Sequence, residues 1–343
     1  TYHIKDKHSY TQNYNSSIEN PEAFWAAIAK DNFSWIRPWS RVLDWDFSTP
    51  KVSWFEDAQL NITENCIDRH LGVIGEKTAI LFEPNDPNEA SEAISYNELH
   101  KRVNKFANAL KSKGIQKGDR VCIYLPMIPE LAISVLACAR IGAIHSVVFA
   151  GFSATALASR INDCDCKMLI TSDGGYRGAK TIDLKSIADE ALLDCNGIES
   201  VLVAKRLHSE IPMVQERDFW LQPLLDSASD ICDAAVMDAE DPLFILYTSG
   251  STGQPKGMVH TTAGYMVYAG YSFKNVFQYE ANDVYWCTAD IGWITGHSYI
   301  VYGPLLNGAT TVMFEGVPSY PDYGRFWSIV EKHKVTQFYT APT

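Results

Sequence analysis

The feature of this sequence that most constrains its fold is a regular alternation of apolar runs with amphipathic stretches. From about residue 95, apolar residues recur at helical spacing until Gly114 ends the run: Leu99, Val103, Phe106, Ala107 and Leu110. The pattern then predicts strands over 121–125, 143–148, 167–171 and 200–203, and helices over 130–141 and 153–162. Strands that alternate with helices indicate a largely parallel sheet, so we predict an α/β fold.

The alternation resumes later, with strands expected over 243–247, 284–288, 310–314 and 336–339. Residues 205–240 are polar and acidic, and we expect them to run over the surface. The final strand passes into a turn and the sequence stops, so we interpret the chain as truncated.

The first seventy residues have a different character, because they are rich in tryptophan and poor in glycine. Asn20 and Pro21 can cap and begin a short helix. We expect the remainder to form an irregular wrap that aromatic side chains anchor on a neighbouring domain. Those tryptophans could serve packing or binding.

Length and charge limit the possible functions. A chain of 343 residues exceeds what one hydrophobic core usually supports, so we expect at least two subdomains. The formal net charge of −12 excludes the broad basic surface that nucleic-acid binding needs. Any site for an anionic ligand must therefore be local.

Cysteine usage and hydropathy bear on the compartment. The eight cysteines form no CxxC pair, which predicts free thiols in a reducing, cytoplasmic environment. Cys164 and Cys166 could be half of a metal site, but no second pair stands at zinc spacing. The chain opens on polar residues, which is unlike a signal peptide. The apolar stretch 131–152 contains Arg140, Gly142 and His145, so we predict no membrane span.

The most informative stretch for chemistry is 243–257, where an apolar strand leads into a loop of small and hydroxyl residues. Glycines let the backbone turn tightly, and hydroxyl and N–H groups can donate to phosphate. The predicted phosphate-binding residues are Thr248, Ser249, Gly250, Ser251, Thr252, Gly253 and Lys256. Pro255 and Gly257 flank the lysine, so the loop is not a Walker A motif. The alternative is a flexible surface loop.

This loop resembles the signature of the acyl-adenylate-forming superfamily. Three further stretches, 149–153, 285–297 and 314–318, and the tryptophan-rich opening resemble its acetyl-CoA synthetase group. The resemblance implies layered α/β subdomains of that superfamily's N-terminal domain, cut off before the small C-terminal domain. Residues 1–70 would be the N-terminal segment of the group, and 71–343 the first part of the AMP-binding domain.

By the same resemblance, the enzyme converts acetate, MgATP and coenzyme A to acetyl-CoA, AMP and pyrophosphate through acetyl-AMP. Trp293, Ile294 and Thr295 would line the acyl pocket, although Trp293 could instead be a core residue. Many relatives have Val at the position of Ile294, and the larger side chain should favour acetate. The implied coenzyme A residues are Phe149, Gly151, Arg177, Gly178, Ala179, Lys180, Thr295 and Ser319.

Two of these positions depart from the usual pattern, with Lys180 in place of Arg and Ser319 in place of Asn. Arg177 and Lys180 could also be an ordinary solvated pair. The adenylating lysine, the nucleotide motifs and the Mg²⁺ ligands are expected beyond residue 343. The alternatives are a propionyl-CoA synthetase, another adenylating ligase, or a nucleotide-binding module without catalysis.

Overall fold

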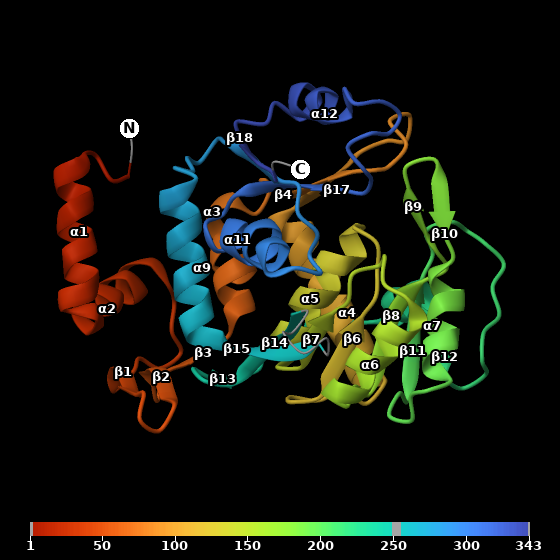
Figure 1. Ribbon diagram of the computed structural model, residues 1–343, viewed down its shortest axis with the longest axis horizontal. Helices are drawn as coiled ribbons and strands as arrows, with labels where there is room; N and C mark the ends of the chain where they lie inside the picture. The colour runs from red at the N-terminus through yellow and green to blue at the C-terminus, as the bar shows by residue number, and fades with distance from the viewer. Residues whose placement is uncertain (1–2, 249–254, 342–343) are drawn as a thin grey trace.

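The computed structural model describes residues 3–248 and 255–341. Within these residues the strands form one seven-stranded sheet, one five-stranded sheet and three two-stranded ribbons (Figure 1). The α/β class is therefore confirmed, but the strands divide between two large sheets. Both sheets have a parallel centre and one antiparallel edge pair, β14–β15 in the larger and β4–β5 in the smaller.

The larger sheet has the order β12-β11-β8-β6-β7-β14-β15. Its strands span Asp218–Trp220 (β12), Ser200–Ala204 (β11), Met168–Ser172 (β8), Arg120–Ile123 (β6), Ile144–Val147 (β7), Pro242–Thr248 (β14) and Lys256–Thr261 (β15). The smaller sheet has the order β18-β16-β17-β4-β5. Its strands span Gln337–Tyr339 (β18), Val284–Cys287 (β16), Thr310–Phe314 (β17), Thr78–Glu83 (β4) and Glu92–Ser95 (β5).

Helices α4 (Tyr96–Ser112) and α5 (Pro129–Ile141) lie between the two sheets and share one core with both of them. The predicted apolar stripe of α4 is buried, and nearly all of α5 is buried as well. A second core packs α6 (Ala154–Cys164) and α7 (Leu184–Leu192) on the far face of the larger sheet. A third packs α12 (Arg325–His333) on the far face of the smaller sheet.

Local signals place the helix ends. The Ser95 hydroxyl accepts from the N–H of Glu98 at 3.2 Å at the start of α4. Gly142 ends α5 with a φ of +73°, a conformation that glycine adopts without steric cost. The predicted cap at Asn20 is confirmed, because its side chain accepts from Ala23 N–H at the start of α2 (Pro21–Asn32).

The expectation of an irregular N-terminal wrap is wrong in part. The segment contains α1 (Lys7–Glu19), α2, a hairpin of β1 (Arg41–Asp46) and β2 (Lys51–Glu56), and the short β3 (Gln59–Leu60). Helix α1 buries none of its residues, so it has no apolar periodicity to detect. The tryptophans do pack: the Trp25 ring meets Trp54 at 6.4 Å and Tyr271 at 5.5 Å between centroids.

The expectation that residues 205–240 only run over the surface is also wrong in part. β12 extends the larger sheet as a parallel edge strand, and α8 (Leu221–Ser227) follows it and buries Leu221. A strand of three residues is too short to show an alternating pattern.

The remaining elements are π-helical η1 (Glu64–Asp68) and η2 (His297–Tyr302), α3 (Arg69–Ile74), β9 (Gly175–Arg177), β10 (Lys180–Ile182), β13 (Met237–Asp238), α9 (Thr262–Val276), α10 (Ile294–Gly296) and α11 (Gly303–Leu306).

Candidate functional site

A cleft lies where the carboxyl ends of strands from both sheets meet. Its cavity of about 230 Å³ is lined by the loops that follow β7, β16 and β17 and by the β9–β10 hairpin. Carboxyl ends of parallel strands are the usual ligand-binding edge of α/β sheets. The arrangement therefore brings loops of both sheets to one site.

The β9–β10 hairpin supplies the positive charge of this cleft. Arg177 and Lys180 are register partners across a two-residue turn, so their side chains leave the same face of the ribbon. The Arg177 guanidinium lies 5.9 Å from the centre of the Phe149 ring. A Cβ on Gly151 would clash with Phe149 Cε1 and lie 3.1 Å from Arg177 Nη1, so glycine is what lets the Phe149 ring lie here, beside Arg177.

The structure thus brings three of the predicted coenzyme A residues together, namely Phe149, Gly151 and Arg177. Lys180 and Ala179 are exposed beside the cavity. Gly178 has a φ of +64° at the turn and packs against the loop after β17, since an added Cβ would lie 3.1 Å from Val317. Ser319 is exposed in that loop, two residues beyond the contact.

Trp293 is not a core residue. Its side chain is 47% exposed, and its ring meets Phe149 and Phe152 at 6.2 Å each. Trp293 and Thr295 line a cavity of about 270 Å³ that shares Cys287, Thr288 and Ala289 with the cleft. The aromatic side chain therefore stands between two adjoining cavities.

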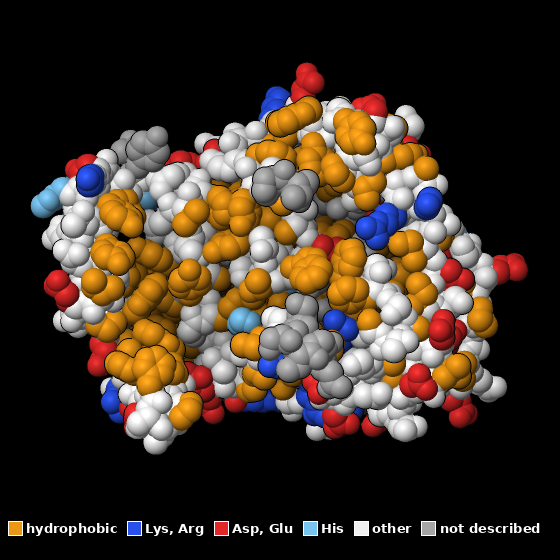
Figure 2. Space-filling view, in the orientation of Figure 1, with side chains coloured by type: hydrophobic (Ala, Val, Ile, Leu, Met, Phe, Trp, Pro, Cys, Tyr) orange, Lys and Arg blue, Asp and Glu red, His pale blue; other side chains and the backbone are white. Residues whose placement is uncertain are grey.

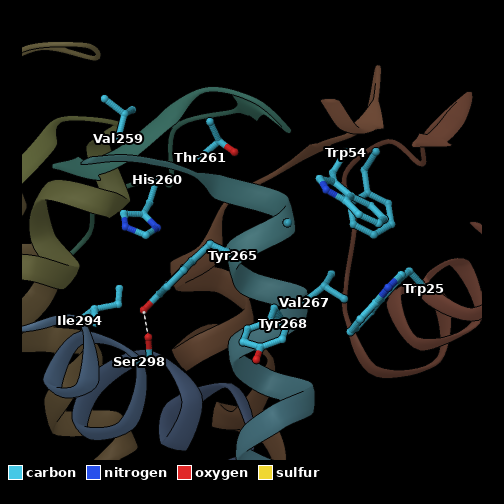
Figure 3. Close-up of a pocket in the computed structure, with 12 residues that line it drawn as sticks. Trp25, Trp54, Val259, His260, Thr261, Tyr265, Val267, Tyr268, Ile294 and Ser298 are labelled. Atoms are coloured by element: carbon cyan, nitrogen blue, oxygen red, sulfur yellow. Dashed lines mark hydrogen bonds between the residues drawn. The ribbon is translucent and has the colours of Figure 1, made fainter. Parts of the chain in front are cut away.

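The Ile294 side chain faces neither of these two cavities. It lines an apolar cavity of about 480 Å³ between the N-terminal segment and α9, opposite Trp25, Trp54 and Tyr268 (Figure 3). Apolar side chains gather on this face of the molecule (Figure 2). Ile294 thus lines a different cavity from Trp293 and Thr295, because consecutive side chains leave a short helical turn in different directions. The acyl pocket stays a prediction.

The predicted phosphate loop joins the two strands of a hairpin. Thr248 ends β14 and Lys256 begins β15, and the two are register partners. Lys256 is exposed. Ser249, Gly250, Ser251, Thr252 and Gly253 lie outside the described residues. The Tyr247 hydroxyl donates to Asp163 Oδ2 at 2.6 Å, which ties the end of β14 to α6.

Comparison with known proteins identifies the family. Residues 68–343 match the family described as AMP-binding enzyme. The chain belongs to this AMP-binding enzyme family. Residues 10–66 match the family described as acetyl-coenzyme A synthetase N-terminus.

The similar relatives of this AMP-binding enzyme include acetyl-coenzyme A synthetase 2 of Pseudomonas putida, which is 56% identical over 97% of this chain and 52% of its own length. The acetyl-coenzyme A synthetase of Rhodobacter capsulatus is 57% identical over 97% of this chain and 51% of its own length. The chain spans about half the length of the curated relatives it matches.

Asp290 lines the cleft, although the sequence analysis did not predict it as a site residue. Burial raises the pKa of its carboxyl to about 6, although the Gly292 N–H donates to Oδ1 at 2.7 Å and the charge of Arg177 acts in the opposite direction. A carboxyl group three residues after the end of β16, in a Gly-bearing loop, is the signal that could have marked it.

Within residues 3–248 and 255–341, no group of three or more His, Cys, Asp or Glu side chains is arranged to hold a metal ion. Cys164 and Cys166 are buried free thiols. No helix in the described part of the chain is both long and apolar enough to cross a membrane.

Proposed function

We propose that this chain supplies the first half of an AMP-forming acetate–CoA ligase. A carboxylate attacks the α-phosphate of ATP, forming acyl-AMP and releasing pyrophosphate. The thiol of coenzyme A then attacks the acyl carbon and releases AMP. Each step brings anions together, so the protein must offset negative charge at defined places.

The observation that carries the proposal is the cleft itself. In a chain of net charge −12, it holds the exposed Arg177 beside an aromatic ring and a glycine that leaves room for close approach. A local cation suits a nucleotide phosphate, and the Phe149 ring offers an apolar surface. We assign Arg177 and Lys180 to the coenzyme A nucleotide, with Phe149, Gly151, Gly178, Ala179, Thr295 and Ser319 around it.

We assign the loop from Thr248 to Lys256 to the β- and γ-phosphates of ATP. Its position between β14 and β15 places Lys256 opposite Thr248 at the mouth of the hairpin. Mg²⁺ would accompany ATP, and we assign none of these residues to the metal. The eight free thiols fit a reducing cytoplasm, which we propose as the location.

The identity of the carboxylic acid substrate is tested in the protein at the full length of its relatives. The assay measures the exchange of labelled pyrophosphate into ATP in the presence of each candidate acid. We expect exchange to be fastest with acetate, and thioester formation to require coenzyme A. Faster exchange with propionate would favour a propionyl-CoA synthetase, and exchange with an amino acid alone would indicate a different adenylating ligase. ATP binding without any exchange would contradict catalysis.

A further inference from the structure

The turn of the β9–β10 hairpin is held by a side chain that follows β4 of the smaller sheet. Asn85 lies two residues beyond the end of β4, and only 3% of it is exposed. Its amide oxygen accepts the Gly178 N–H at 3.0 Å, and its amide N–H donates to the Gly178 carbonyl at 2.9 Å. One side chain thus satisfies both backbone groups of the residue that follows Arg177.

A second contact holds the hairpin along its strand. The Arg206 guanidinium stacks 4.7 Å from the centre of the Tyr176 ring, and it pairs with Glu315 at 2.6 Å. The Glu315 side chain is 1% exposed and follows β17 of the smaller sheet. Both contacts therefore fasten the hairpin from outside its own sheet.

Such fastening has a physical reason. A two-stranded hairpin is marginally stable alone, and like charges directly opposite each other destabilise it. Arg177 and Lys180 occupy such opposite positions. Two hydrogen bonds to one residue fix the orientation of the turn as well as its position, because rotation about either bond breaks the other.

We propose that Asn85 is a positioning residue that aims the Arg177–Lys180 turn into the cleft for binding the nucleotide phosphate of coenzyme A. The inference rests on the proposed function, since it assumes that Arg177 binds that ligand. Asn85 acts from behind the turn, where Gly178 engages both its polar groups.

The test is a double-mutant cycle in the protein at the full length of its relatives. Asn85→Ala should raise the KM for coenzyme A about tenfold, the effect of losing two hydrogen bonds that hold a binding group. Acetate-dependent pyrophosphate exchange should stay within about twofold. Asn85→Ala in an Arg177→Ala, Lys180→Ala background should add no further rise, because both cations that it aims are gone.

A matched control removes a buried amide elsewhere. Asn104 is 1% exposed on α4 and donates to the Asp230 carbonyl at 2.9 Å. Asn104→Ala should lower the melting temperature and leave the KM for coenzyme A unchanged. If Asn85→Ala does not fold, Asn85→Ser, which keeps a smaller polar side chain behind the turn, should raise the same KM, and an unchanged KM would overturn the positioning role.

Different outcomes would overturn the positioning role of Asn85 and the proposed coenzyme A site. If Arg177→Ala raises the KM for coenzyme A and Asn85→Ala does not, the positioning role is overturned. The positioning role is also overturned if the rise in KM caused by Asn85→Ala adds to the rise caused by removing the cations. It is likewise overturned if Asn85→Ala slows exchange and thioester formation equally. If Arg177→Ala itself leaves the KM unchanged, the proposed coenzyme A site falls and the inference falls with it.

Discussion

Trp293 and Ile294 are neighbours in sequence but face different cavities. The indole stands between the cleft and a cavity that Thr295 also lines, whereas Ile294 borders the larger apolar cavity beside Trp25 and Trp54. An acyl chain needs an apolar wall of limited size. Substitutions at these two positions therefore report which cavity receives the acid.

We predict that Ile294→Ala shifts the preference from acetate towards propionate or butyrate. Losing three carbons enlarges the space, and each methylene in such a pocket is worth about 1–3 kcal/mol of selectivity. The measurement is the ratio of kcat/KM for the acids, with Val276→Ala on α9 as an exposed control. A shift with Trp293→Ala but not with Ile294→Ala would assign the acyl group to the other cavity.

Lys256 gives a second prediction at the residue scale. Lys256→Ala should raise the KM for ATP about tenfold or more, because a charge-assisted contact to phosphate is worth about 1.5–3 kcal/mol. The control is Lys101→Ala, which removes an exposed lysine of α4. Equal ATP kinetics in both variants would make Lys256 a solvated loop residue.

At the scale of elements, α12 is fastened to β4 through one buried carboxylate. Glu83 is fully buried and accepts hydrogen bonds from Arg325, Lys332 and His333 of the helix, and from Ser91. Burial acts to raise the pKa of Glu83, but these hydrogen bonds together hold it at about 2. The ionised form therefore stabilises the fold.

We predict that Glu83→Gln lowers the free energy of unfolding by about 3 kcal/mol at pH 7. A carboxyl whose folded pKa is lowered contributes fully above its ordinary pKa of 4.5 and loses that contribution as pH falls towards 2. Urea denaturation at pH 7, 5 and 3.5 should show wild type and variant converging on acidification. Glu98→Gln, in a half-exposed pair with Arg102, should change stability by less than about 1 kcal/mol. Parallel profiles for Glu83→Gln would contradict the assignment.

Elements with local signals were predictable, and their arrangement was not. The α4 stripe, the cap at Asn20 and five strands of the larger sheet follow from periodicity and capping, whereas β12 and β15 were not predicted. The division into two sheets depends on pairings such as β17 with β4, which lie more than two hundred residues apart. Asn85 gave no signal either, because its partner Gly178 is 93 residues away. The directions of Trp293 and Ile294 likewise depend on packing.

For the whole molecule, two sheets present their ligand-binding edges with α4 and α5 packed between them. The β14–β15 hairpin belongs to the larger sheet, and the β9–β10 turn is fastened to the smaller one through Asn85. The two proposed anion sites thus lie on different hairpins, so a substitution at one could leave the other undisturbed. We propose that the phosphates of ATP and the nucleotide of coenzyme A bind at these two different sites.

Measuring both half-reactions in Arg177→Ala, in the protein at the full length of its relatives, tests most directly whether the two ligands bind at different sites. We predict a higher KM for coenzyme A with kcat retained, as expected for loss of uniform binding, and acetate-dependent pyrophosphate exchange close to wild type. The effect should be smaller with dephospho-CoA, which lacks the 3′-phosphate. Equal losses in exchange and thioester formation would contradict the assignment of Arg177 to coenzyme A, because Arg177 would then support the fold or the ATP site.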